Sequence, residues 1–141
     1  MTNQEKKYNK GEWSELYAFV QLLKDGRIYA ADENVNKIED QYLPILKIVR
    51  EENVGTVMNY IPGDTIRIYN NNQLIQEIRS EYVEEQKTIL FEKIFSGSST
   101  EKGAFSIPET QDMMSKLHIQ KIKAGSNKKS DIEMQIHDIN T

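Results

Sequence analysis

The stretch "TIRIYNNNQLIQEIRS" at residues 65–80 decides the fold class. Apolar and polar side chains alternate on both sides of three consecutive asparagines, Asn70, Asn71 and Asn72. This alternation is typical of strands that bury one face, and asparagine tolerates the left-handed conformation that tight turns need. The stretch therefore predicts a β-hairpin, and with it a sheet, in the middle of the chain.

An amphipathic helix is expected before this hairpin. Apolar side chains at helical spacing form one stripe: Trp13, Leu16, Tyr17, Val20 and Leu23. Asn9, followed three residues later by Glu12, matches a capping box, and Gly26 after Asp25 is a typical helix stop. We expect a helix from about Lys10 to Lys24.

Two segments between the helix and the hairpin are expected to be extended. "RIYAADEN" at residues 27–34 is a short apolar piece that ends in polar loop residues. "YLPILKIVREE" at residues 42–52 fits either a strand or a short helix. Pro44 argues against a helix interior, because proline lacks the amide hydrogen that a helix needs, so the extended form is favoured.

More helix and then more sheet are expected after the hairpin. Val83, Leu90, Phe91 and Ile94 predict a helix over 81–95, which the small residues of "SGSSTEKG" at 96–103 should end. "SIPETQDMMSKL" at 106–117 predicts a short helix with its proline near the start. "IQKIKA" at 119–124 and "DIEMQIHD" at 131–138 are expected to be strands separated by a loop.

The order of these elements indicates an α+β or mixed α/β fold: an N-terminal helix, then a central mixed β-sheet with flanking helices. With 141 residues the chain is long enough for one domain over 1–141 with a core of its own. Residues 1–8 are polar and are expected to form a flexible tail.

Composition excludes several classes of protein. The chain has no cysteine, which rules out a disulfide framework or a cysteine zinc site and fits a reducing cytoplasm. No apolar run approaches the roughly 20 residues that span a bilayer, so no membrane association is expected. The net charge of −4 argues against bulk affinity for nucleic acid, but it leaves room for a local basic surface.

Asp131 is the first candidate for chemistry. It heads the last predicted strand, directly after a loop that contains Lys128 and Lys129. A carboxylate in that place suits Mg²⁺, a hard cation that takes oxygen ligands, keeps several waters and needs only one or two protein carboxylates. The alternative is that Asp131 caps the strand and is solvated, and spacing alone favours this alternative.

Other polar residues of the last strand could join such a site. Glu133 and Gln135 share a face with Asp131 and could reach a ligand beside it, although such residues are more often the wet side of an edge strand. His137 could act as a general base, although a surface histidine at a strand end is commoner.

The first helix offers two further carboxylates. Glu12 and Glu15 are neighbours on the helix surface, and Glu15 could point over the end of a sheet towards a metal ion. The alternative is that first-turn acids complement the helix dipole, which explains Glu12 fully and Glu15 less well.

A basic stretch precedes Asp131. Residues 116–129 contain five lysines and no acid: Lys116, Lys121, Lys123, Lys128 and Lys129. Such a patch suits the phosphates of a nucleic-acid backbone, or else it is a solvated basic face balanced by acids elsewhere. A glycine-rich nucleotide-binding pattern, a zinc-peptidase signature and a serine-nucleophile elbow are all missing from the sequence.

Four stretches together resemble a known family. "NKGEWSELYAFVQLLKDGRIYAADENVNKI" at 9–38 is similar to the N-terminus of the HpaII-type family of type II restriction endonucleases. "YLPILKIVREE", "AFSIPETQDMMSKL" and "KIKAGSNKKSDIEMQIHD" follow in the family's order. The resemblance covers nearly the whole chain, from Asn9 to Asp138, and its first and last stretches are the most specific.

The resemblance implies a nuclease of the PD-(D/E)xK type. Asp131 matches the first acidic position of that motif, and Glu15, with Glu12 second, is the candidate for the helix glutamate that often completes the site. The implied reaction is Mg²⁺-dependent hydrolysis of a phosphodiester in double-stranded DNA at a short palindromic site, with Lys121, Lys123, Lys128 and Lys129 near the phosphates. A palindromic site implies a homodimer whose two-fold axis matches that of the DNA.

The chain departs from the family at one point. The lysine-bearing strand that follows the acidic strand in the motif is not found, and no upstream lysine matches that position. We therefore expect the N-terminal portion of a longer endonuclease, which alone does not cut DNA. The competing hypotheses are a non-catalytic DNA-binding or protein-interaction module that keeps the family's N-terminal fold, and a small structural α+β domain unrelated to DNA.

Overall fold

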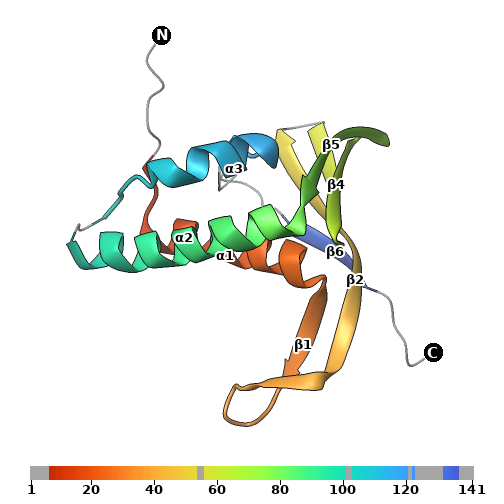
Figure 1. The fold of residues 1–141 in the computed structure, drawn as a ribbon, viewed down its shortest axis with the longest axis horizontal. Helices are drawn as coiled ribbons and strands as arrows, with labels where there is room; N and C mark the ends of the chain where they lie inside the picture. Colours follow the sequence, from red (N-terminus) through yellow and green to blue (C-terminus); the bar gives the residue numbers. More distant parts are fainter. Residues whose placement is uncertain (1–6, 54–55, 101–102, 121, 123–131, 137–141) are drawn as a thin grey trace.

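The computed structural model describes residues 7–53, 56–100, 103–120, 122 and 132–136. Its elements follow one another as α1 (Lys10–Asp25), β1 (Arg27–Ala31), β2 (Lys37–Asn53), β3 (Thr56–Ile61), β4 (Thr65–Asn70), β5 (Gln73–Arg79), α2 (Ser80–Thr100), a 3₁₀ turn η1 (Pro108–Thr110), α3 (Gln111–Lys116) and β6 (Ile132–Ile136). Helices pack beside a sheet (Figure 1), which confirms the α+β class.

The sheet has the strand order β1-β2-β3-β4-β5, and β6 pairs with β2. Every described pairing is antiparallel, so the expected mixture of parallel and antiparallel strands is wrong. The predicted hairpin at 65–80 is confirmed as β4 and β5, whose turn places Asn71 and Asn72 at positive φ values of 51° and 70°. The short strand β3 was not expected from the sequence.

The strand β2 is long and serves two parts of the molecule. Its first half, residues 37–44, pairs with β1, and its second half lies between β3 and β6. The predicted extended form of residues 42–52 is therefore confirmed, with Pro44 beside Arg27 in the ladder. We call residues 27–44 the arm, because this two-stranded ribbon projects from the rest of the molecule, the body (Figure 1).

The predicted first helix is confirmed, together with its caps. The Asn9 side chain accepts from the Glu12 amide at 2.8 Å, the Glu12 carboxylate accepts from the Asn9 amide at 3.0 Å, and Gly26 ends the helix at φ 64°. The helix α1 lies beside α2 (Figure 1). It reaches the sheet through an edge-to-face contact of Phe19 with Tyr60, whose ring centroids are 5.0 Å apart.

The helix α2 is longer than the sequence predicts. It continues to Thr100, so the expected stop after Phe95 is wrong. The Ser96 and Ser98 hydroxyls donate to carbonyls three residues earlier, at 3.4 and 3.1 Å, which satisfies them inside the helix. Gly97 is needed for packing, because a Cβ there would lie 2.4 Å from the Phe105 ring. Small residues that resemble a breaker therefore serve a close contact.

The short helix around Pro108 is confirmed as η1 and α3. The strand expected at 119–124 is wrong for the residues that the structure describes there, because Ile119, Gln120 and Ile122 lie outside any strand. The Ile119 amide instead donates to the carbonyl of Met114 at 2.8 Å, which folds the chain back over the end of α3. Burial of Ile119 and Ile122 explains their apolar character.

Both ends of the described chain join the body. Tyr8 is buried and exchanges backbone hydrogen bonds with Phe105 at 3.0 and 2.9 Å, so the expected tail cannot include it. The last predicted strand is confirmed as β6. Within the described residues, no helix combines the length and the apolar character that crossing a bilayer requires.

Candidate functional site

The strand β6 directly follows Asp131 in the sequence, the first candidate residue for metal binding. It runs antiparallel to the second half of β2, with Ile132 opposite Arg50 and Ile136 opposite Ile45. Asp131 itself lies outside the described residues. Its neighbour Ile132, the first residue of β6, is nevertheless fixed in register beside Arg50. We call this end of the strand the head of β6.

Arg50 is a charged residue in the interior of the sheet. Only 3% of it is exposed, and it lies between Met58 of β3 and Ile132 of β6 in the ladders. A buried guanidinium is costly unless it is paired and hydrogen-bonded. Its burial therefore marks the head of β6 as a place where the fold tolerates charge. The sequence carried a signal for this, because Arg50 follows the buried Ile48 by two residues and so shares its face.

Arg50 acts on a buried tyrosine next to it. Burial raises the pKa of Tyr60 to about 12, while the charge and the hydrogen bond of Arg50 act in the opposite direction. The Tyr60 hydroxyl donates to the carbonyl of Leu117 at 2.7 Å. This chain of contacts links the second half of β2 to the end of α3, where the basic stretch begins.

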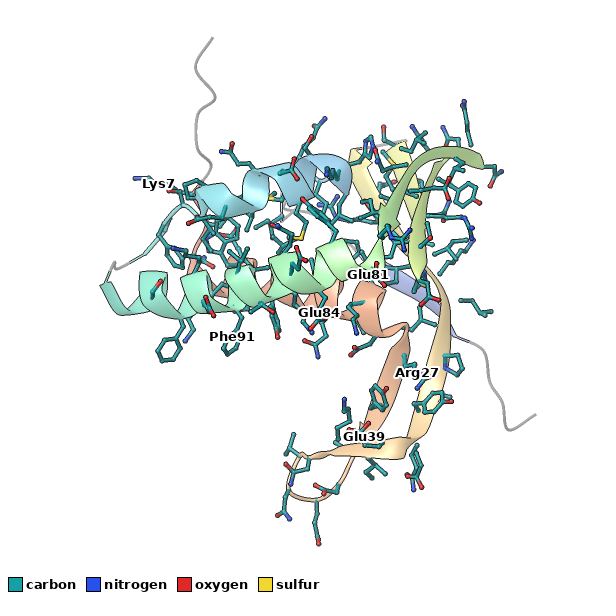
Figure 2. All side chains as sticks on the ribbon, viewed as in Figure 1. Lys7, Arg27, Glu39, Glu81, Glu84 and Phe91 are labelled. Carbon is teal, nitrogen blue, oxygen red and sulfur yellow. The ribbon has the colours of Figure 1, made fainter. Side chains whose placement is uncertain are left out.

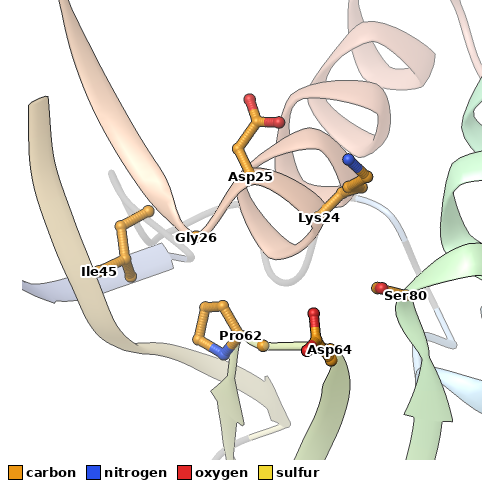
Figure 3. A pocket seen from close by; sticks show the side chains of 8 residues that line it. Lys24, Asp25, Gly26, Ile45, Pro62, Asp64 and Ser80 are labelled. Carbon is orange, nitrogen blue, oxygen red and sulfur yellow. The ribbon is translucent and has the colours of Figure 1, made fainter. Parts of the chain in front are cut away.

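A pocket of about 290 Å³ opens at the base of the arm. Figure 3 shows Lys24 and Asp25 at the end of α1 on one side of the pocket, and Pro62 and Asp64 of the turn between β3 and β4 on the other. Ile45 also lines it, and this residue pairs with the far end of β6. The pocket is therefore separated from the head of β6 by about 13 Å of strand. The predicted site and the pocket are different places.

Comparison with known proteins identifies the family. The HpaII restriction endonuclease family matches residues 9–141, which include α1, the arm and β6. The type II restriction enzyme HpaII of Haemophilus parainfluenzae is 35% identical over an alignment of 136 residues, and the alignment covers 94% of this chain. The chain belongs to the HpaII restriction endonuclease family. No solved structure gives a significant match.

The HpaII family relative is much longer than this chain. The alignment covers 37% of that enzyme, so the chain spans little more than a third of the relative's length. The resemblance seen in the sequence is confirmed, and the match covers both candidate regions, the first helix and the last strand.

The two helix glutamates of this HpaII family member have different surroundings. The Glu12 carboxylate accepts the hydrogen bond that caps α1, which supports the structural interpretation of that residue. Glu15 is exposed. Besides the contact of Phe19 with Tyr60, a backbone junction joins the end of the helix to the sheet, where the Gly26 carbonyl accepts from the Ile45 amide at 2.9 Å. Glu15 lies about 16 Å from that junction along the helix axis.

A cluster of metal-binding side chains is not found within the part of the chain that the structure describes. No three histidine, cysteine, aspartate or glutamate side chains come together among the described residues. The other predicted members of the site lie outside the described residues: Lys121, Lys123, Lys128, Lys129, Asp131 and His137, with the side chains of Glu133 and Gln135. The assignments of Glu12, Glu15 and these residues to a site therefore stay predictions.

Lys116 is the one lysine of the basic stretch that lies within the described residues. Its Nζ lies 3.5 Å from the Asp112 carboxylate and 4.4 Å from the Tyr82 ring centroid. Tyr82 donates a hydrogen bond to Asp112, which, with Lys116, holds the pKa of that carboxyl below its usual range. Lys116 thus ties α3 to α2, a structural role that the run of lysines did not reveal.

Proposed function

We propose that this HpaII family member is a type II restriction endonuclease. In this proposal it hydrolyses phosphodiester bonds of double-stranded DNA at a short palindromic site, requires Mg²⁺ and works as a homodimer. The observation that carries the proposal is the family match over residues 9–141, supported by 35% identity to an enzyme named as a type II restriction enzyme. The fold agrees, because the candidate residue Asp131 directly precedes a strand of the sheet beside Arg50.

Each candidate residue has a role in this proposal. Asp131 would hold the ion together with Glu15, or with Glu12 in second place, and Mg²⁺ when bound would activate water and stabilise charge on the phosphate. The basic residues would neutralise phosphates of the duplex: Lys121, Lys123, Lys128 and Lys129. A homodimer would present two such sites with the symmetry of a palindrome.

The experiment measures binding and cleavage of plasmid DNA with Mg²⁺ and with a chelator. One reaction contains the 141-residue chain alone, and a second also contains the part of the Haemophilus parainfluenzae enzyme that lies outside the aligned region. We expect DNA binding in both, no cleavage in the first, and discrete fragments in the second. Asp131→Asn should abolish cleavage while binding persists.

The two glutamates provide a matched pair of variants. Glu15→Gln should abolish cleavage, whereas Glu12→Gln should leave it nearly unchanged because glutamine keeps an acceptor for the helix cap. Selective DNA binding without cleavage in either reaction would favour the non-catalytic DNA-binding module. If no DNA is bound or cut in either reaction, the proposed function is wrong.

A further inference from the structure

The arm is the most unusual feature of the molecule. It is a two-stranded ribbon that extends away from the helices and the rest of the sheet (Figures 1 and 2). Every residue from Ala30 to Lys37 is exposed, and 83% of Val35 at the tip is exposed. An isolated two-stranded ribbon is only marginally stable in water, so this one needs side-chain contacts within the ribbon to hold it together.

Aromatic and cationic side chains supply that order. The Tyr29 and Tyr42 rings lie across the ribbon from each other, with centroids 5.8 Å apart. The Arg27 guanidinium lies 4.2 Å from the Tyr42 ring centroid, and the Lys37 ammonium lies 4.4 Å from that of Tyr29. Cation–π contacts of this kind hold both cations in place on the ribbon surface. The arm therefore presents two positioned positive charges.

A bulge lies between these charges. The register of the arm moves from Tyr29 opposite Tyr42 to Ala30 opposite Ile38, so residues 39–41 have no partner in the ladder. Bulges of this kind re-aim side chains, often next to functional sites. The bulge borders an open hollow of about 490 Å³, which Asp40 and Gln41 line together with both tyrosines. Two side chains that can form hydrogen bonds with a ligand, Asp40 and Gln41, thus lie beside the rings of the two tyrosines.

The charges of the arm are partly balanced within it. Residues 27–44 carry two basic and four acidic side chains, a net charge of −2. Two of the acids are already engaged: Asp32 accepts from the Asn34 and Asn36 amides, both at 2.9 Å, and Glu39 lies 3.6 Å from Lys37. Asp40 remains beside the hollow, where it can accept hydrogen bonds from a ligand.

We propose that the arm enters the major groove of duplex DNA, with Arg27 and Lys37 on phosphates and Asp40 and Gln41 on base edges. The major groove, about 12 Å wide, admits a two-stranded β-ribbon. Aspartate suits the amino group of cytosine, and glutamine suits the paired donor and acceptor of adenine. This inference rests on the proposed function, and it adds a specificity element separate from the candidate cleavage site.

The experiment measures DNA binding by fluorescence anisotropy with the 141-residue chain. Duplexes are first selected by the wild-type chain from a pool with a randomised centre, and each variant is then compared on a selected and a scrambled duplex over a range of salt concentrations. The double exchange Asp40→Gln with Gln41→Asp keeps the net charge. It should reduce discrimination between the two duplexes by about 5- to 150-fold without changing the salt dependence.

Arg27→Ala should act differently from the exchange. It should weaken binding to both duplexes and lower the slope of log affinity against log salt by about 1. Arg79→Ala is the matched control, because Arg79 is an exposed arginine 3.5 Å from Glu81 on the body. This control should change neither affinity nor discrimination.

The outcomes distinguish a failure of the inference about the arm from a failure of the proposed function. If the wild-type chain selects and binds duplexes but the arm variants behave like Arg79→Ala, the inference is wrong and the proposed function stands. If the arm variants change only the oligomeric state, measured by light scattering, the arm is a protein interface and the inference is wrong. If the wild-type chain binds no duplex, the proposed function fails first and the inference fails with it.

Discussion

The two halves of β2 are one strand in two environments. In the arm, residues 37–44 pair with β1, and Ile38 is only half-buried. In the body, the following residues lie between β3 and β6, and Ile48 is fully buried. Neither half alternates strictly between apolar and polar residues, so the sequence pattern alone does not distinguish them. The number of neighbouring elements decides whether an isoleucine stabilises the fold.

The largest expected effect tests this comparison directly. Ile48→Ala should lower the free energy of unfolding by about 2–5 kcal/mol, because it leaves a cavity in a packed interior. Ile38→Ala should cost no more than about 0.5 kcal/mol, as expected of a partly solvated site. Urea denaturation followed by circular dichroism measures both. Equal losses of the free energy of unfolding would mean that the arm unfolds with the body and that the two halves of β2 contribute equally to stability.

A smaller effect tests how tightly the body is packed. Gly97→Ala should lower the free energy of unfolding by about 1–3 kcal/mol, because the new methyl group would overlap the Phe105 ring. Gly11→Ala in α1 is the control, since its Cβ would meet only the Asn9 side chain at 3.4 Å. It should stabilise the helix by up to about 1 kcal/mol. A gain of stability at Gly97 would show that α2 and Phe105 are not in close contact.

The smallest effect concerns a polar contact on the surface of the body. The pKa of Asp112 is lowered by the hydrogen bond from Tyr82 and by Lys116, so this carboxylate stabilises the fold above its unfolded pKa of about 3.9. That contribution is lost as the pH falls through the lower folded value. The melting temperature of Asp112→Asn should lie below that of the wild type at neutral pH, and the gap should close in acid. A gap that does not depend on pH would contradict this role.

Local signals predicted much of the fold. Asn9, Glu12 and Gly26 fixed the ends of α1, and the asparagines of the hairpin fixed its turn, because caps and turns depend on a few neighbouring residues. The strand β3 was missed because Thr56–Ile61 is short and irregularly patterned. The end of α2 was misplaced because Gly97 is needed for close packing against Phe105. No local sequence pattern connects these two residues.

The candidate site was predicted less completely. Placing Asp131 at the head of a strand followed from alternation, and the pairing of Ile132 with Arg50 agrees with it. Arg50 was overlooked because arginine is normally exposed, and its two-residue spacing from Ile48 becomes decisive only with the pairing of β2 on both sides. The contacts of Lys116 with Asp112 and Tyr82 depend on how α3 packs beside α2, which spacing cannot reveal.

The continuity of β2 has a mechanical consequence. A single strand runs from the exposed arm into the centre of the sheet, so the arm resembles a beam clamped at one end. The clamp is stiff, because the Ile45 amide is bonded to the carbonyl of Gly26 and β2 is paired on both sides just beyond it. The unpaired residues 39–41 are the compliant point. A load on the tip would bend the arm at its bulge and leave Arg50 undisturbed.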